Sequence, residues 1–134
     1  MSWDISIQRF NRVYTSLEQI PNDEQCVPLG SQAEVRAAIS QVFSGTDWSD
    51  PAWGVFQCAI GSVEFNMGKK EPSEGFALHV RASSQIVEPI IALCRAQGWQ
   101  ALDFSDGRFL EQSSDASASL EAWASYRDQI LGKA

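Results

Sequence analysis

Several short stretches of the chain alternate apolar with polar residues, which is the spacing of strands that bury one face. Near the N-terminus, Trp3, Ile5 and Ile7 alternate with polar side chains. The same period recurs in a group of three runs and once more further along, at 53–60, 63–67, 76–81 and 99–104. Because short connections join the three middle runs, with a tight turn predicted at Gly61-Ser62, we expect these strands to pair antiparallel.

Two segments show the spacing of helices with one apolar face. In the first, Ser31 and Glu34 form a capping box, and the apolar positions that follow predict a helix ending near Gly45. The second segment, 84–97, precedes Gly98, a favoured C-terminal cap. Pro89 leaves its start open, because a helix from 84 would be kinked whereas one from about 88 would have proline at its favoured first position.

The remaining connections complete a single α+β domain over 1–134. Residues 11–29 form a long polar connection, and 47–54 a turn-rich loop. An Asp106-Gly107 turn leads to a short possible strand at 108–111, and 112–134 contain a linker and a final amphipathic helix. We therefore expect an antiparallel sheet of about five strands, with the helices packed mainly on one face. Its core should bury four residues together: Ile39, Phe65, Leu78 and Ile90.

The charge of the chain bears on its partners. Its 134 residues carry a net charge of −7, with the acidic residues spread along the whole length. Such a charge disfavours binding to nucleic acid or to an anionic membrane, and it favours encounter with a basic protein. The same charge also fits ordinary solubility. The only basic doublet, Lys69-Lys70, is followed at once by Glu71.

The cysteine and histidine content disfavours a metal centre. Three cysteines are widely spaced and one histidine is present, whereas a structural zinc needs four such ligands. Asp103 and Asp106 lack the spacing of a calcium loop. Cys58 and Cys94 lie in apolar runs and are predicted to be buried thiols. We expect no cofactor, no secretion signal and no membrane span, and hence a cytoplasmic protein.

Polar residues on the predicted strands form a first candidate site. If the apolar positions of each strand face the helices, Glu64, Asn66, His79 and Arg81 share the opposite face. Asp4, Ser6 and Gln8 join them if the first strand belongs to the same sheet. This face is either a solvated surface or a surface for a ligand or partner. Catalysis is disfavoured because no nucleophile elbow, phosphate loop or metal set accompanies His79.

The loop over 47–54 supplies a second candidate. Asp47, Trp48, Asp50 and Trp53 alternate acid with indole. Exposed tryptophan beside acid suits contact with a basic partner. In the alternative interpretation, the indoles pack under the sheet edge and Asp50-Pro51 only shapes the turn.

Several segments also carry a resemblance. They are MSWDISIQRF, IPND, PLGSQAEV, DWSDPAWG, SVEFNMG, GFALHVRAS and GWQALDFSDGRFLE. Together they resemble a family of small bacterial proteins of uncharacterised activity, from Met1 to about Glu111. In its acidic α+β character the chain is also similar to immunity proteins that neutralise secreted antibacterial toxins, including those of type VI secretion. This similarity implies a non-catalytic protein that forms a heterodimer with a cognate toxin. A binding module for a small molecule or a housekeeping partner is the alternative.

Overall fold

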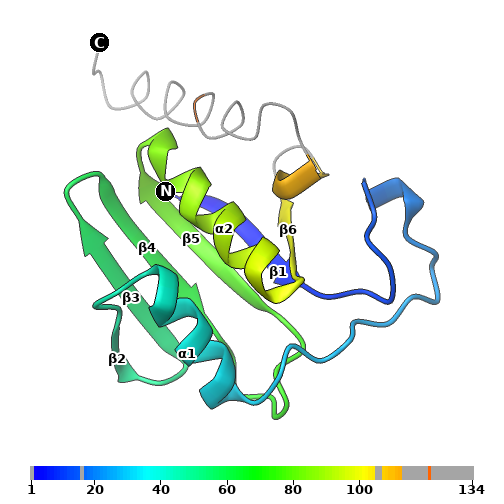
Figure 1. Ribbon diagram of the computed structural model, residues 1–134, viewed down its shortest axis with the longest axis horizontal. Coiled ribbons are helices and arrows are strands. Elements are labelled where there is room, and N and C mark those ends of the chain that lie inside the picture. Colours follow the sequence, from blue (N-terminus) through cyan, green and yellow to red (C-terminus); the bar gives the residue numbers. More distant parts are fainter. Residues whose placement is uncertain (1, 16, 105–106, 113–120, 122–134) are drawn as a thin grey trace.

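In the part of the chain that the structure describes, one sheet carries two helices on a single face (Figure 1). The computed structural model describes residues 2–15, 17–104, 107–112 and 121. The α-helices are α1 (Gln32–Val42) and α2 (Val87–Gln97), with single 3-10 turns at Leu17–Gln19, Ser84–Ile86 and Leu110–Gln112. The strands are β1 (Trp3–Gln8), β2 (Asp47–Asp50), β3 (Trp53–Cys58), β4 (Gly61–Asn66), β5 (Phe76–Ala82), β6 (Gln100–Asp103) and β7 (Arg108–Phe109).

The sheet places the N-terminal strand well inside it. Its order is β2-β3-β4-β5-β1-β6-β7, and every neighbouring pair is antiparallel. Strands β2 to β5 form a meander in chain order, and β1 pairs with the last strand of that meander on one side and with β6 on the other. The α+β class and antiparallel sheet predicted from the sequence are confirmed, with seven strands in place of about five.

The two helices begin for different reasons. At α1 the predicted capping box is present, since the Ser31 hydroxyl accepts the Glu34 amide at 3.1 Å and the Glu34 carboxylate accepts the Ser31 amide at 3.1 Å. At α2 a 3-10 turn precedes the helix, which begins at Val87. Pro89 therefore lies in the first turn, where its missing N–H costs no intrahelical bond, and it causes no kink. Gly98 caps the helix in the left-handed conformation, with φ 72°.

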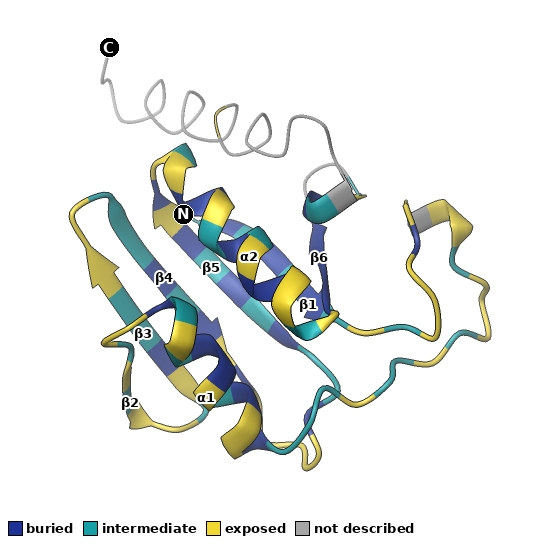
Figure 2. Cartoon of the chain, in the orientation of Figure 1, coloured by how far each residue is buried: buried dark blue, intermediate teal, exposed yellow. Residues whose placement is uncertain are grey.

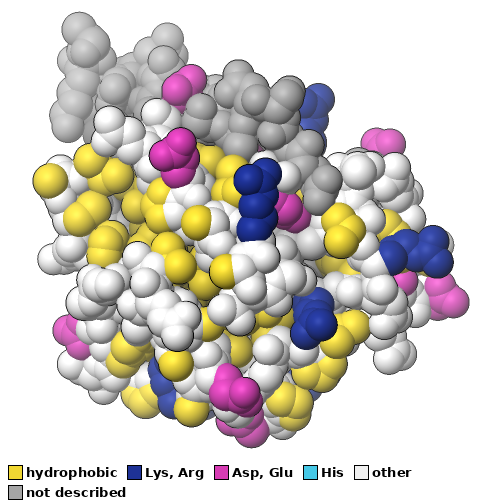
Figure 3. Space-filling view, viewed as in Figure 1, with side chains coloured by type: hydrophobic (Ala, Val, Ile, Leu, Met, Phe, Trp, Pro, Cys, Tyr) yellow, Lys and Arg dark blue, Asp and Glu magenta, His cyan; other side chains and the backbone are white. Residues whose placement is uncertain are grey.

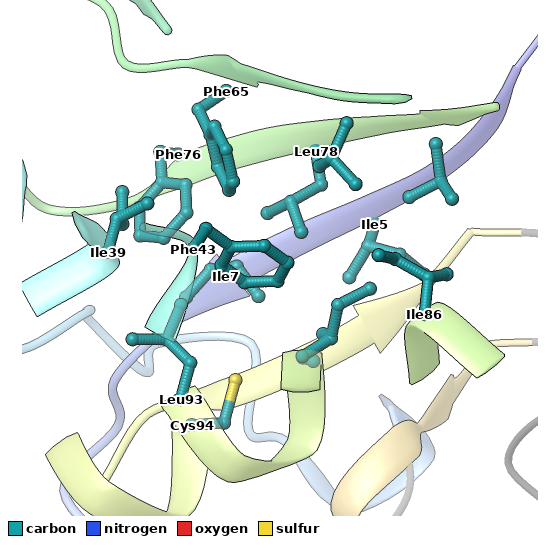
Figure 4. Packing of buried hydrophobic residues seen from close by; sticks show 14 of the residues in the cluster. Ile5, Ile7, Ile39, Phe43, Phe65, Phe76, Leu78, Ile86, Leu93 and Cys94 are labelled. Carbon is teal, nitrogen blue, oxygen red and sulfur yellow. The ribbon is translucent and has the colours of Figure 1, made fainter. Parts of the chain in front are cut away.

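The core lies between the helices and the sheet. The predicted quartet of Ile39, Phe65, Leu78 and Ile90 is fully buried in one cluster. Figure 2 shows the buried positions along the helices and strands, and Figure 4 labels Ile39, Phe65 and Leu78 within the cluster. Strands β1, β4 and β5 contribute alternate residues to it, as their period of two requires. Seen from the helix side, charged side chains are scattered among apolar and uncharged groups (Figure 3).

Three local predictions were wrong. Residues 47–50 form strand β2 at the sheet edge, where the sequence predicted only loop. The hairpin turn after β3 falls at Ala59-Ile60, so that Gly61 already belongs to β4. Cys58 is exposed, because this end of the hairpin extends beyond the helices (Figure 2), whereas Cys94 is buried as predicted.

A smaller apolar cluster covers part of the other sheet face. Tyr14, from the segment after β1, packs with Leu102 of β6 and Phe109 of β7. The Gln100 side chain holds this segment in place, accepting the Tyr14 amide at 3.1 Å and donating to the Tyr14 carbonyl at 2.8 Å. This face is therefore closed over β6 and β7, while the outward residues of β1, β3, β4 and β5 form what we call the open face.

The predicted linker and final helix, and Asp106 of the predicted hairpin turn, lie outside the described residues. None of the helices among the described residues has the length and apolar character needed to cross a bilayer.

Removal of the Leu78 side chain tests the core. Leu78 is completely buried on β5, so Leu78→Ala should lower the free energy of unfolding by about 2–5 kcal/mol, through lost burial and a residual cavity. Chemical denaturation measures this change. Val13→Ala, at a residue that is 69% exposed, is the control and should leave the midpoint nearly unchanged. An unchanged midpoint for Leu78→Ala would contradict the core described above.

Thiol labelling tests the three cysteine environments. In the folded protein Cys58 should react first, because it is exposed. Cys26 should react more slowly, since burial and the charges of Glu74 and Glu24 raise its pKa and reduce its thiolate fraction. Cys94 should react only on unfolding, since burial raises its pKa strongly. Cys58→Ser should abolish the fast phase, and labelling of Cys94 at the rate of Cys58 would refute the assignment.

Candidate functional site

The strand register brings polar side chains into rows across the open face. Val55 of β3, Glu64 of β4, His79 of β5 and Asp4 of β1 are successive cross-strand partners. Cross-strand partners point to the same side of a sheet. The predicted proximity of Glu64 and His79 is therefore confirmed, and β1 adds Asp4 to the row.

Asp4 and His79 form the closest polar contact of this row. The His79 Nδ1 lies 2.8 Å from Asp4 Oδ1, and the Ser2 hydroxyl donates to the same oxygen at 2.6 Å. Burial raises the pKa of the Asp4 carboxyl, but the hydrogen bonds from Ser2 and His79 and the charges of His79 and Arg81 outweigh it. The pKa therefore lies below its ordinary value of 3.8. The contact holds the imidazole ring in one orientation.

Trp53 covers the His79 ring. The two ring centroids are 5.5 Å apart and the planes are inclined by only 16°, so the rings are stacked. Trp53 is nevertheless 37% exposed. Stacking against a ring that Asp4 already holds removes much of the freedom of the indole, so little further entropy is lost when a partner contacts it.

Glu64 and Arg81 form a second charged pair beside the stack. Arg81 Nη1 lies 3.3 Å from Glu64 Oε2. The Glu64 side chain is 29% exposed and the Arg81 side chain is 41% exposed. Solvent screening leaves such a pair with little effect on stability, so both groups remain open to exchange with groups on a partner.

The acidic loop divides between the two sides of the sheet. In the register, Asp47 opposes Val55 and Asp50 opposes Trp53, and a bulge lies between them. The four residues from Asp47 to Asp50 thus oppose the three residues from Trp53 to Val55, so both aspartates point to the open face. The Asp47 carboxylate accepts the Ser49 hydroxyl, and its backbone amide at 2.8 Å, and these bonds lower the Asp47 pKa.

Trp48 faces the helices instead. Its indole Nε1 donates to the Ser40 hydroxyl at 2.9 Å, and its ring lies against Gly54 so closely that a β-carbon there would be 2.5 Å away. The interpretation that an indole packs under the sheet edge therefore holds for Trp48, whereas Trp53 lies on the open face and is partly exposed. Asn66 is exposed on the open face, as its pairing with Trp53 and Ala77 requires.

A second exposed aromatic residue, Phe104, lies near this site and was not predicted from the sequence. Phe104, just beyond β6, is 61% exposed, and its amide donates to the Asp4 carbonyl at 3.3 Å. Trp53 and Phe104 are two of the three large apolar residues that are exposed in the described part of the chain. The period of two could have indicated this residue, since Phe104 follows Leu102 at the spacing of residues on one face. The sequence prediction for this region instead relied on the neighbouring Asp106-Gly107 turn.

The arrangement at Asp4 differs from a catalytic triad. In a triad the histidine lies between the nucleophile and the carboxylate, whereas here Ser2 and His79 both bond to one Asp4 oxygen. The Asp4 carboxylate thus orients the His79 ring, and His79 does not activate the Ser2 hydroxyl. Among the described residues, no group of three or more His, Cys, Asp or Glu side chains could hold a metal ion.

Comparisons of the chain with protein-family models, with curated proteins and with solved structures give no significant match. The resemblance to small bacterial proteins and to immunity proteins stays a prediction.

The lowered pKa of Asp4 predicts a pH dependence of stability. An ionised Asp4 is favoured in the folded chain, so it contributes stability above its unfolded value of 3.8, and this contribution is lost as the pH falls through the lower folded value. The difference in free energy of unfolding between the wild type and Asp4→Asn should therefore be largest near neutrality and shrink in acid. Denaturant titrations across the pH range measure it, and a difference independent of pH would contradict the assignment.

Proposed function

We propose that this is a non-catalytic binding protein whose open sheet face docks on a basic protein partner. The observation that carries the proposal is Trp53, an indole that is partly exposed yet held in place by stacking on His79. Tryptophan is among the residues enriched in binding hot spots, and an indole already held in place loses little entropy on binding. Phe104, whose amide bonds to the Asp4 carbonyl, adds a second exposed apolar side chain next to Asp4 in the sheet.

Charge supports a basic partner. The strand register places more acidic residues than arginines on the open face. Arg81 is outnumbered by four acids, which are Asp4, Asp47, Asp50 and Glu64. A surface of this kind attracts a positively charged partner over a long range and repels acidic ones. The net charge of −7 acts in the same direction.

We further propose that the partner is a cognate bacterial toxin in the cytoplasm, neutralised when this face covers the toxin's active site in a heterodimer. An inhibitor of this kind needs a rigid surface of roughly 800 Å² per partner. The antiparallel β1, β3, β4 and β5 supply the rigid support. A housekeeping partner would use the same face, and co-expression separates the two possibilities.

Co-expression with the product of the adjacent gene tests the toxin proposal. The cells should die when that product is made alone and survive when this chain is made with it. If the product is harmless alone, or kills equally in both cases, the toxin proposal is wrong. A pull-down from the native bacterium would then identify another partner.

Substitution of Trp53 tests the face itself. Trp53→Ala should weaken binding by about 30-fold or more, since a hot-spot residue contributes about 2 kcal/mol. Val13→Ala removes an exposed apolar side chain from the segment after β1 and is the matched control. Calorimetry or surface-based kinetics gives both affinities, with circular dichroism to confirm folding. Equal effects of the two substitutions would argue against the open face.

Charge reversal tests the electrostatic part. Asp47→Lys should slow association, and added salt should reduce the difference from wild type, because salt screens long-range attraction. Glu88→Lys, at an exposed residue of α2 on the helix side, changes the net charge equally and should have a smaller effect. Equal slowing by both would mean that only total charge matters.

A further inference from the structure

A cleft on another part of the surface has the opposite charge character. It has a volume of about 400 Å³ and lies where the β2–β3 turn, the start of the β4–β5 loop and α1 meet. This volume falls in the range of small-molecule sites. The lining residues are Gln32, Arg36, Asp50, Pro51, Ala52, Gly68 and Lys69.

Two cations line this cleft without an ion-pair partner among the described residues. Arg36 is half-buried on α1, and Lys69 is exposed in the β4–β5 loop. The ion pairs in the described part of the chain involve other basic residues, including Lys70 with Glu74. An arginine that is partly withdrawn from water usually has a carboxylate or phosphate partner, because its planar fork suits those groups.

Gln32 gives an independent sign of an incomplete site. Only 8% of this residue is exposed, and its Nε2 donates to the Lys70 carbonyl at 2.7 Å. The other end of the amide, Oε1, is buried and has no hydrogen-bond partner within the described residues. A buried acceptor left in this state is destabilising, because it has lost its hydrogen bond to water without gaining another. Gln32 and Arg36 are one helical turn apart and so lie on the same side of α1.

The charge in the cleft comes from side chains and not from the helix terminus. The backbone N–H of Gln32, at the start of α1, already donates to the Glu71 carboxylate at 3.1 Å. The N-terminus of α1 is thus already paired with the carboxylate of Glu71. Among the described residues Asp50 is the single acid that lines the cleft, and its Oδ1 accepts the Ala52 amide at 2.9 Å.

We propose that this cleft binds a small organic anion. Its carboxylate or phosphate group pairs with Arg36 and Lys69, and a hydroxyl or N–H of the same molecule donates to Asp50, or to Gln32 Oε1 once that buried side chain turns toward the cleft. The two charges select an anion, and the two acceptors select one that also carries a hydrogen-bond donor. This site shares Asp50 with the open face, but Trp53, which carries the proposed function, is not among its lining residues.

Titration of the full-length protein with two anions tests the site. Citrate carries carboxylates and a hydroxyl, and glycerol 3-phosphate carries a phosphate and hydroxyls. At constant ionic strength, at least one should bind with a dissociation constant of millimolar or below, measured by calorimetry, and should raise the melting temperature. The anion that binds identifies the headgroup, and binding of neither one overturns the proposal.

Neighbouring lysines give a matched pair of variants. Lys69→Gln should weaken binding about tenfold, as expected for one charge-assisted contact. Lys70→Gln removes the same charge one residue away, from a lysine already paired with Glu74 at 2.8 Å, and should leave the affinity unchanged. Arg36→Gln should weaken binding at least as much as Lys69→Gln. Equal effects of Lys69→Gln and Lys70→Gln would show nonspecific attraction and refute the site. No protein partner is needed, so failure here leaves the proposed function standing.

Discussion

The pairing of β1 on both of its edges is the constraint on which the rest of the structure depends. Strand β1 joins β5 on one side and β6 on the other, so residues at the very start of the chain connect the meander to the strands near residue 100. Trp3 strengthens this junction, because its buried indole donates to the Asp103 carboxylate at 3.2 Å. Without β1 the sheet would separate into two pieces, and each would expose an apolar face to water.

The same pairing creates the candidate site. In a sheet, every residue that enters the core is followed by one that points the other way. Burial of Ile5 and Leu78 as partners therefore brings Asp4 and His79 together on the open face. The segment after β1 covers that face only over β6 and β7, where Gln100 holds Tyr14. The polar row stays uncovered because the Tyr14 cluster packs on Leu102 and Phe109, which belong to β6 and β7.

The fold was predictable where one local signal acted alone. The period of two in β1, β4 and β5 and the capping box of α1 each indicated the observed element. The open face followed, because Glu64 and His79 lie on strands joined by a short loop. That Trp48 and Trp53 lie on opposite sides of the sheet was not predictable, because it depends on a bulge in β2 that no residue type in this segment indicates. Strand β7 has only two residues, too few for any periodicity, so its prediction at 108–111 came from the Asp106-Gly107 turn signal alone.

The β2–β3 turn belongs to both surfaces. Asp50 is the register partner of Trp53, which forms the aromatic contact of the open face, and it also lines the cleft with Arg36. Trp48 fixes this edge from beneath, since its ring leaves no room for a β-carbon at Gly54. An anion that shifted the turn would shift Trp53 as well. Linkage then requires that a partner on the open face alter the anion's affinity by the same factor as the anion alters the partner's, so the two sites are coupled to the extent that this turn moves.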